Sequence, residues 1–224
     1  MKVGQLNFYG DHNLGLYGKA CDKFCIIGNI EEKNIDQIKK LLNAECIRTT
    51  ISNTDFIGIL AVFNENGILL PKIANSNEIE FFSKIGKQFG LNCEILESKF
   101  TAIGNLILCN SKGAVISKLF GRNEKKKIEE CLGVESCYEN VAGMKTVGSA
   151  GVATNKGCLL HRDAEEKEIE QIKSILKVEV GIGTVNFGSP FVGSAIIANS
   201  NGAIIGESST GPEVVRIQET LGFF

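Results

Sequence analysis

One short phrase recurs along the chain. The four clearest copies begin at Ile57, Ile103, Val147 and Val192 and read IGILAVFNENGILLP, IGNLILCNSKGAVIS, VGSAGVATNKGCLLH and VGSAIIANSNGAIIG. In each copy a leading glycine is followed nine positions later by a second glycine. A fifth, degraded copy, LGLYGKACDKFCIIG, has its leading glycine at Gly15 and carries a phenylalanine where the second glycine belongs.

The spacing of these copies indicates a repeat architecture. The leading glycines are separated by 43, 46, 44 and 45 residues, a period in the range of known structural repeats. They are Gly15, Gly58, Gly104, Gly148 and Gly193.

Each copy predicts a β-hairpin. The stretch after the leading glycine is apolar, and it is followed by NENG, NSKG, TNKG or NSNG and then by a second apolar run. Asn and Gly tolerate the positive φ angles of tight reversals, so these tetrapeptides are typical of hairpin turns. The glycines themselves are interpreted as turn and close-packing residues, because no GxxxxGK[ST] or GxGxxG phosphate-binding motif occurs.

A helix and a further strand follow the hairpin. In EEKNIDQIKKLLN the apolar Ile35, Ile38 and Leu42 recur at helical spacing, and EEKEIEQIKSILK repeats this pattern. After each of the first four helices comes another short run with strand character, for example NCEILES. The predicted unit is therefore hairpin, helix, strand.

The fifth unit lacks this last strand, because the chain stops at LGFF after its helix. A spare strand, KVGQLNF, precedes the first hairpin. Pairing it beside the last hairpin would close the units into a ring without an unpaired edge. We therefore predict one α+β domain, residues 1–224, of five repeats at about 9–53, 54–99, 100–142, 143–187 and 188–224, with strand 2–8 closing the fifth.

Composition excludes several classes of protein. The chain has 224 residues, 43% of them hydrophobic, and a formal net charge of −2, so it can bury a core but has no basic excess for general phosphate binding. No apolar run approaches the length of a membrane span, and the first residues lack a signal-peptide core. These features favour a soluble, cytoplasmic protein.

The eight cysteines form no CxxC pair, and the chain has only two histidines, His12 and His161. Metal-site spacing is therefore absent, and the cysteines are interpreted as reduced, mostly buried thiols. No cofactor is expected.

The phrases TAIGNLILCNSKGAVIS, TVGSAGVATNKGCLLH, VGSAIIANSNGAIIG and STGPE, in this order, resemble the archaeal branch of the translation initiation factor 6 family. The resemblance covers the whole chain. It implies the pentein fold, a closed five-fold pseudosymmetric β/α-propeller. Proline is frequent in the family after the second hairpin strand; Pro71 retains it, whereas Lys118 and Arg162 replace it. A phosphorylatable tail, present in eukaryotic members beyond the fifth unit, is not expected after Phe224.

The resemblance also implies a function. Family members bind the large ribosomal subunit on its intersubunit face, mainly through an L14-type ribosomal protein with nearby rRNA, and so prevent the small subunit from joining. A role in large-subunit maturation is implied as well, and the chain is expected to act as a monomer. The residues implied in partner binding directly follow the leading glycines: Leu16, Ile59, Asn105, Ser149 and Ser194. Asn105 is the strongest candidate, because an exposed amide offers donors and an acceptor; the alternative is that it bonds backbone groups of its own turn.

Other readings compete with this one. A pentein-fold amidine hydrolase or amidinotransferase would need a cysteine nucleophile in the last blade, but no cysteine follows Cys158. A repeat scaffold for another macromolecule differs only in its partner. His161 fits a loop or packing role better than catalysis, so no catalytic residue is expected. The run Lys125–Lys127 fits a solvated helix face, with rRNA contact as the alternative, and STGPE fits a helix N-cap.

Overall fold

The computed structural model describes residues 2–224 and contains five three-stranded sheets. We call these sheets blades 1 to 5. In every blade the first two strands form an antiparallel hairpin, and the third strand pairs in parallel with the second hairpin strand. The strands, blade by blade, are β2 (Gly18–Ala20), β3 (Phe24–Ile27) and β4 (Glu45–Arg48); β5 (Val62–Phe63), β6 (Gly67–Pro71) and β7 (Asn92–Leu96); β8 (Ile107–Cys109), β9 (Ala114–Ile116) and β10 (Ser136–Tyr138); β11 (Gly151–Ala153), β12 (Gly157–His161) and β13 (Glu179–Gly183); and β14 (Ile196–Ala198), β15 (Ala203–Gly206) and β1 (Val3–Leu6).

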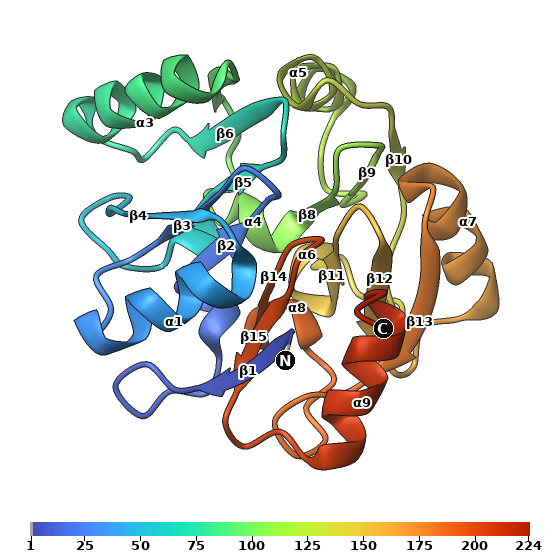
Figure 1. Ribbon diagram of the computed structural model, residues 1–224. Coiled ribbons are helices and arrows are strands. Elements are labelled where there is room, and N and C mark those ends of the chain that lie inside the picture. Colours follow the sequence, from blue (N-terminus) through green and yellow to red (C-terminus); the bar gives the residue numbers. More distant parts are fainter. Residues whose placement is uncertain (1) are drawn as a thin grey trace.

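The N-terminal strand closes the ring, as predicted. β1 pairs in parallel with β15, and its Val3 lies opposite Ala203. In Figure 1 this blue strand lies beside the red hairpin of the last blade. The strand is shorter than the predicted segment 2–8 and ends at Leu6, because the chain then enters a tight turn bridged between Phe8 and Asp11.

Long helices lie around the outside of the ring (Figure 1). Their apolar faces cover the sheets: Ile35, Ile38 and Leu42, for instance, are all buried. The helices are α1 (Glu32–Leu42), α3 (Ser76–Phe89), α5 (Arg122–Leu132), α7 (Glu166–Leu176) and α9 (Gly211–Thr220). The last helix begins within STGPE, where the Glu213 carboxylate accepts hydrogen bonds from the backbone N–H and the hydroxyl of Thr210 and Pro212 lies in the first turn, which confirms the predicted N-cap.

Each blade also packs against the helix that follows the hairpin of the next blade. A Cβ at Gly67 of blade 2 would overlap the carbonyl oxygen of Cys131 in α5, so this contact requires glycine. The second glycines of blades 3, 4 and 5 lie equally close to the ends of α7, α9 and α1. Blade 1 has Phe24 at this position, and its ring packs on Phe89 of α3 at 4.9 Å between centroids.

The start of each repeat differs from the prediction. The residues around each leading glycine form one turn of helix, and the first hairpin strand begins only afterwards. These short helices are η1 (Leu14–Leu16), α2 (Ile57–Leu60), α4 (Ile103–Leu106), α6 (Val147–Ala150) and α8 (Val192–Ala195). A single helical turn around a glycine buries two apolar residues. A segment this short has no helical periodicity in its sequence that would distinguish it from a strand.

The hairpin turns differ as well, because their glycines do not adopt positive φ. Instead, the Asn64 side-chain oxygen accepts hydrogen bonds from the backbone N–H groups of Asn66 and Gly67. Asn110 and Asn199 hold their turns in the same way. Asparagine therefore shapes these turns through its side chain and not through a left-handed backbone.

Candidate functional site

The five short helices meet in a closed ring of backbone contacts. A Cβ on Gly58 would overlap the carbonyl oxygen of Gly15, and a Cβ on Gly104 would overlap that of Gly58. The contact recurs around the molecule and closes where a Cβ on Gly15 would overlap the carbonyl oxygen of Gly193. Only glycine permits backbones to approach this closely. The predicted packing role of the leading glycines is confirmed.

This arrangement gives the molecule two distinct ends. The short-helix end consists of η1, α2, α4, α6 and α8 with the tight turns that precede them. Each first strand runs from a short helix to a hairpin turn, so the hairpin turns form the opposite end, which we call the hairpin end.

The predicted partner-binding residues occupy equivalent places at the short-helix end. Each is the third residue of its short helix, next to the glycine that contacts the neighbouring helix. All five are half-buried: Leu16, Ile59, Asn105, Ser149 and Ser194. The structure therefore brings them together, although Asn105 is less exposed than expected.

The side chains of Asn105 and Ser149 differ in their hydrogen bonding. The Ser149 hydroxyl donates to the backbone carbonyl of Thr146 at 2.9 Å. Within residues 2–224 the Asn105 side-chain amide makes no hydrogen bond, and only its backbone N–H does, to the carbonyl of Ala102. The amide of Asn105 thus does not serve its own turn, and its donors and acceptor are available to a partner.

Exposed aromatic rings lie at this end, on the segments that precede η1, α2 and α8, and were not anticipated from the sequence. Tyr9 (68% exposed) and Phe187 (83%) are on the tight turns, both at positive φ, and Phe56 and Phe191 (each 41%) directly precede α2 and α8. Large apolar side chains at the surface are typical of interaction sites when they gather on one face. For Phe56 and Phe191 the sequence signal is an aromatic residue directly before the IG or VG pair, whereas Tyr9 and Phe187 carry no such signal.

At the hairpin end, in contrast, the hairpin turns are joined to one another by side-chain hydrogen bonds. Asn155 of blade 4 donates to the carboxylates of Asp22 and Glu65 at 2.9 and 3.1 Å. Its side-chain oxygen accepts from Ser111, and Asp22 accepts from Ser200. All five hairpin turns are linked in this way, so few of their polar groups remain for a partner.

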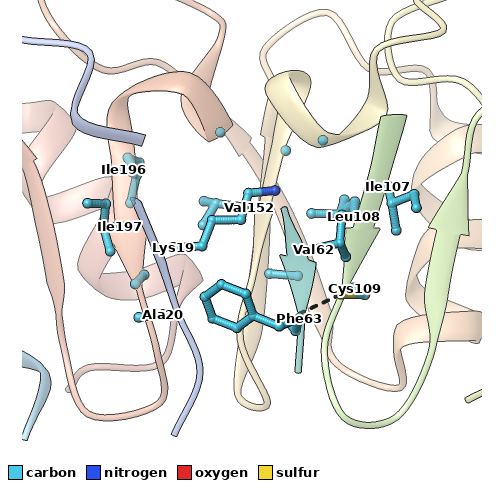
Figure 2. Close-up of a pocket in the computed structure, with 15 residues that line it drawn as sticks. Lys19, Ala20, Val62, Phe63, Ile107, Leu108, Cys109, Val152, Ile196 and Ile197 are labelled. Atoms are coloured by element: carbon cyan, nitrogen blue, oxygen red, sulfur yellow. Dashed lines mark hydrogen bonds between the residues drawn. The ribbon is translucent and has the colours of Figure 1, made fainter. Parts of the chain in front are cut away.

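A small cavity of about 50 Å³ lies between the blades. Side chains from several blades, including Phe63, Val152 and Leu108, gather around it (Figure 2). Lys19 also lines it and donates through Nζ to the carbonyl of Gly104 at 2.9 Å. Burial lowers the pKa of Lys19 to about 8. The space is too small for a metabolite and is lined mainly by apolar groups, so it is no substrate site.

The sequence model of the eIF-6 family matches residues 3–220. This chain belongs to the eIF-6 family. Proteins called translation initiation factor 6 from Pyrococcus abyssi and Pyrococcus horikoshii are both 41% identical to it, over 99% and 100% of this chain and of their own lengths. The protein of that name from Methanococcus vannielii is 44% identical over 96% of each chain.

Among solved structures, a DDAH mutant from Pseudomonas aeruginosa complexed with citrulline is similar at a TM-score of 0.50. It is 9% identical and covers 75% of this chain and 68% of its own. A likeness at this identity concerns the fold alone. Together with the five three-stranded sheets, it confirms the pentein fold predicted for this eIF-6 family chain.

His161 and Cys158 of the eIF-6 family chain do not form a catalytic pair. Cys158 is fully buried in the middle strand of its blade, and burial raises the pKa of its thiol far above the usual range. His161 packs edge-on against Phe191, and its Nδ1 accepts a hydrogen bond from the backbone N–H of Asp163. Burial lowers the pKa of His161, whereas the Asp163 carboxylate opposes this shift.

The basic run on α5 is ion-paired within the protein. Lys125 and Lys126 face Glu129 and Glu130 one turn further along the helix, and Lys127 lies 3.5 Å from Glu94. Lys125 also lies over the ring of Tyr138. Lys126 is exposed, whereas Lys125 and Lys127 are half-buried, and the three pairs offset the charge of the run.

Within residues 2–224 no helix is long and apolar enough to cross a bilayer. The same part of the chain contains no group of three His, Cys, Asp or Glu side chains that could hold a metal ion.

Proposed function

We propose that this eIF-6 family chain binds the large ribosomal subunit through its short-helix end and prevents the small subunit from joining. The full-length relatives named translation initiation factor 6 support the ribosomal context. By the family resemblance, the bound surface is the intersubunit face of the large subunit, and an L14-type ribosomal protein is the main contact. A part in large-subunit maturation belongs to the same proposal.

The observation that carries the choice of surface is the position of Asn105. It belongs to a ring of five equivalent residues, its amide is without an intramolecular partner among residues 2–224, and exposed aromatic side chains lie around the same end. Such a mixture of apolar rings and unsatisfied polar groups is typical of a protein–protein interface. The hairpin end offers no comparable set, because its turns bond to one another.

The charge of the chain favours a protein partner over rRNA. With a net charge of −2, and with the run Lys125–Lys127 paired to carboxylates, the chain has little to offer a phosphate backbone. We therefore expect binding to weaken only modestly as salt rises, with rRNA contacts contributing locally.

In this proposal the chain acts as a monomer in the cytoplasm and by steric exclusion alone. It needs no cofactor and performs no chemical step, which agrees with the full burial of Cys158 and the raised pKa that burial gives its thiol. The alternative of an amidine-converting enzyme is therefore not favoured.

The test is sedimentation of the purified protein with separated large and small subunits. We expect it to co-sediment with large subunits only and to reduce the yield of joined ribosomes as its concentration rises. Binding to both subunits, or full joining at saturating protein, would contradict the proposal. Binding to neither subunit would favour the scaffold alternative with another macromolecular partner.

A further inference from the structure

Two cysteines lie directly opposite each other on neighbouring strands of blade 1. β3 and β4 run in parallel, and their register places Cys25 beside Cys46. Side chains at opposed positions of adjacent strands point to the same side of the sheet. Both residues accordingly belong to the apolar cluster beneath α1, which contains Ile38 and Leu42. Among the strand pairs of residues 2–224, this is the one pairing of cysteine with cysteine.

The spacing of these residues suits a disulfide. Adjacent strands lie about 4.8 Å apart, within the roughly 4.4–6.8 Å between Cα atoms that disulfides span. The two thiols influence each other: the neighbouring sulfur raises the pKa of Cys25 well above its usual value and lowers that of Cys46. Lys39 and Arg48 lower the pKa of Cys46 further, against the effect of its burial.

The two cysteines also differ in access. Cys25 is fully buried, whereas Cys46 is half-buried on β4, the edge strand of its sheet. An oxidant in solution would therefore reach Cys46 first, with Cys25 placed to react second. A half-exposed thiol beside cationic groups and next to a resolving thiol is the usual arrangement of a redox-active pair.

We propose that Cys25 and Cys46 form a reversible disulfide, with Cys46 as the attacking thiol and Cys25 as the resolving one. The oxidant is a low-molecular-weight disulfide. The Cys46 thiolate attacks one of its sulfurs, the sulfur–sulfur bond breaks, and one small thiolate leaves and takes up a proton. Cys25 then loses its proton and attacks the Cys46 sulfur, which releases the second small thiolate. Two protein thiols are thereby oxidised, and one small disulfide is reduced to two thiols.

The experiment treats the full-length protein with glutathione disulfide, then unfolds it in urea so that iodoacetamide can block every free thiol, and maps the cysteines by digestion and mass spectrometry. We expect a Cys25–Cys46 cross-link with the other six cysteines alkylated. In the untreated protein Cys46 should react with iodoacetamide at least about tenfold faster than Cys93 and Cys137, because burial raises the pKa of both of those half-buried thiols.

Single variants separate the two roles. Cys25→Ser should accumulate a mixed disulfide with glutathione on Cys46, and Cys46→Ser should leave Cys25 unmodified. Cys93→Ser is the matched control and should keep the cross-link. A cross-link between other cysteines, or a Cys46 that stays reduced in both the unmodified and the Cys25→Ser protein, would overturn the proposal, and neither result bears on ribosome binding.

Discussion

Gly58 lies so close to the carbonyl oxygen of Gly15 that no side chain can be placed between the two short helices. The same contact recurs between each neighbouring pair and closes through Gly193 onto Gly15. The ring is thus held at its centre by backbone atoms, which cannot move aside as a flexible side chain could.

Gly58→Ala should therefore destabilise the protein strongly. The added methyl group overlaps backbone atoms of η1, and we expect the free energy of unfolding to fall by about 3 kcal/mol, at the upper end of overpacking effects. Urea denaturation measures this. Gly211→Ala is the matched control: its methyl group would meet no atom within 4 Å, and its effect should be within about 1 kcal/mol. Equal denaturation midpoints for Gly58→Ala and the unmodified protein would contradict the packing argument.

Ring closure can be tested by removing residues 1–8. The deletion exposes the edge of β15 and removes Val3 and Phe8, both buried. We expect a loss of several kcal/mol, a large share of the roughly 5–15 kcal/mol of an ordinary domain. Thermal unfolding of the truncated chain should begin at lower temperature and be less cooperative. Removal of Phe224, which is 83% exposed, is the control, and it should leave the transition unchanged.

The features of the fold that the sequence predicts correctly are those that follow from its internal repeats. A period near 45 and a missing fifth strand were sufficient to predict a closed ring, because both are properties of the whole chain. The short helices were missed because Ile57 and Leu60 are buried equally well in one helical turn or in a strand. The exposure of Phe187 and the pairing of Cys25 with Cys46 depend on turn geometry and strand register, which one sequence does not specify.

Alkaline pH should destabilise the folded state through its buried thiols. Burial raises the pKa of Cys21, Cys109 and Cys131 to about 12. In the unfolded chain a thiol has a pKa of about 8.5, so above that pH the unfolded state binds fewer protons than the folded state. The stabilising contribution is complete below about pH 8 and is lost as pH rises toward 12.

Each of these thiols should lower the free energy of unfolding by about 1.4 kcal/mol per pH unit, once the same thiol in the unfolded chain is ionised. Urea denaturation at pH 7, 8, 9 and 10 under reducing conditions measures the slope. Cys21→Ala should make the fall of the unfolding free energy with pH shallower by about 1.4 kcal/mol per pH unit. Cys46→Ser should not, because the pKa of Cys46 is lowered in the folded protein. Constant stability from pH 8 to 10 would refute this linkage.

Catalysis is expected to be absent. The thiol of Cys158 is fully buried, which raises its pKa, and no cysteine follows it in the last blade. Arginine, agmatine and methylated arginines should therefore remain unconverted when incubated with the protein, as measured by product formation. Turnover that disappears in Cys158→Ser, while the unmodified protein is active, would overturn this expectation.

Asn105→Arg tests the proposed binding surface. A bulky cation at the third position of α4 would obstruct a shape-matched contact at the short-helix end, while the amide that it replaces makes no hydrogen bond within residues 2–224. We expect binding to large subunits to weaken at least about tenfold, as for an interface residue worth more than 1 kcal/mol, and subunit joining to be restored.

The matched control is Asn92→Arg, the same change at an exposed position at the start of β7, on the hairpin end. It should bind large subunits as the unmodified protein does. Both variants should melt within a few degrees of that protein, because Asn105 is half-buried and Asn92 is exposed and loses only one long hydrogen bond, from its amide to the Cys131 carbonyl at 3.3 Å. If Asn92→Arg alone lost binding, the hairpin end would be the bound surface. If Asn105→Arg bound large subunits with unaltered affinity, the choice of the short-helix end would be wrong, although large-subunit binding itself would stand.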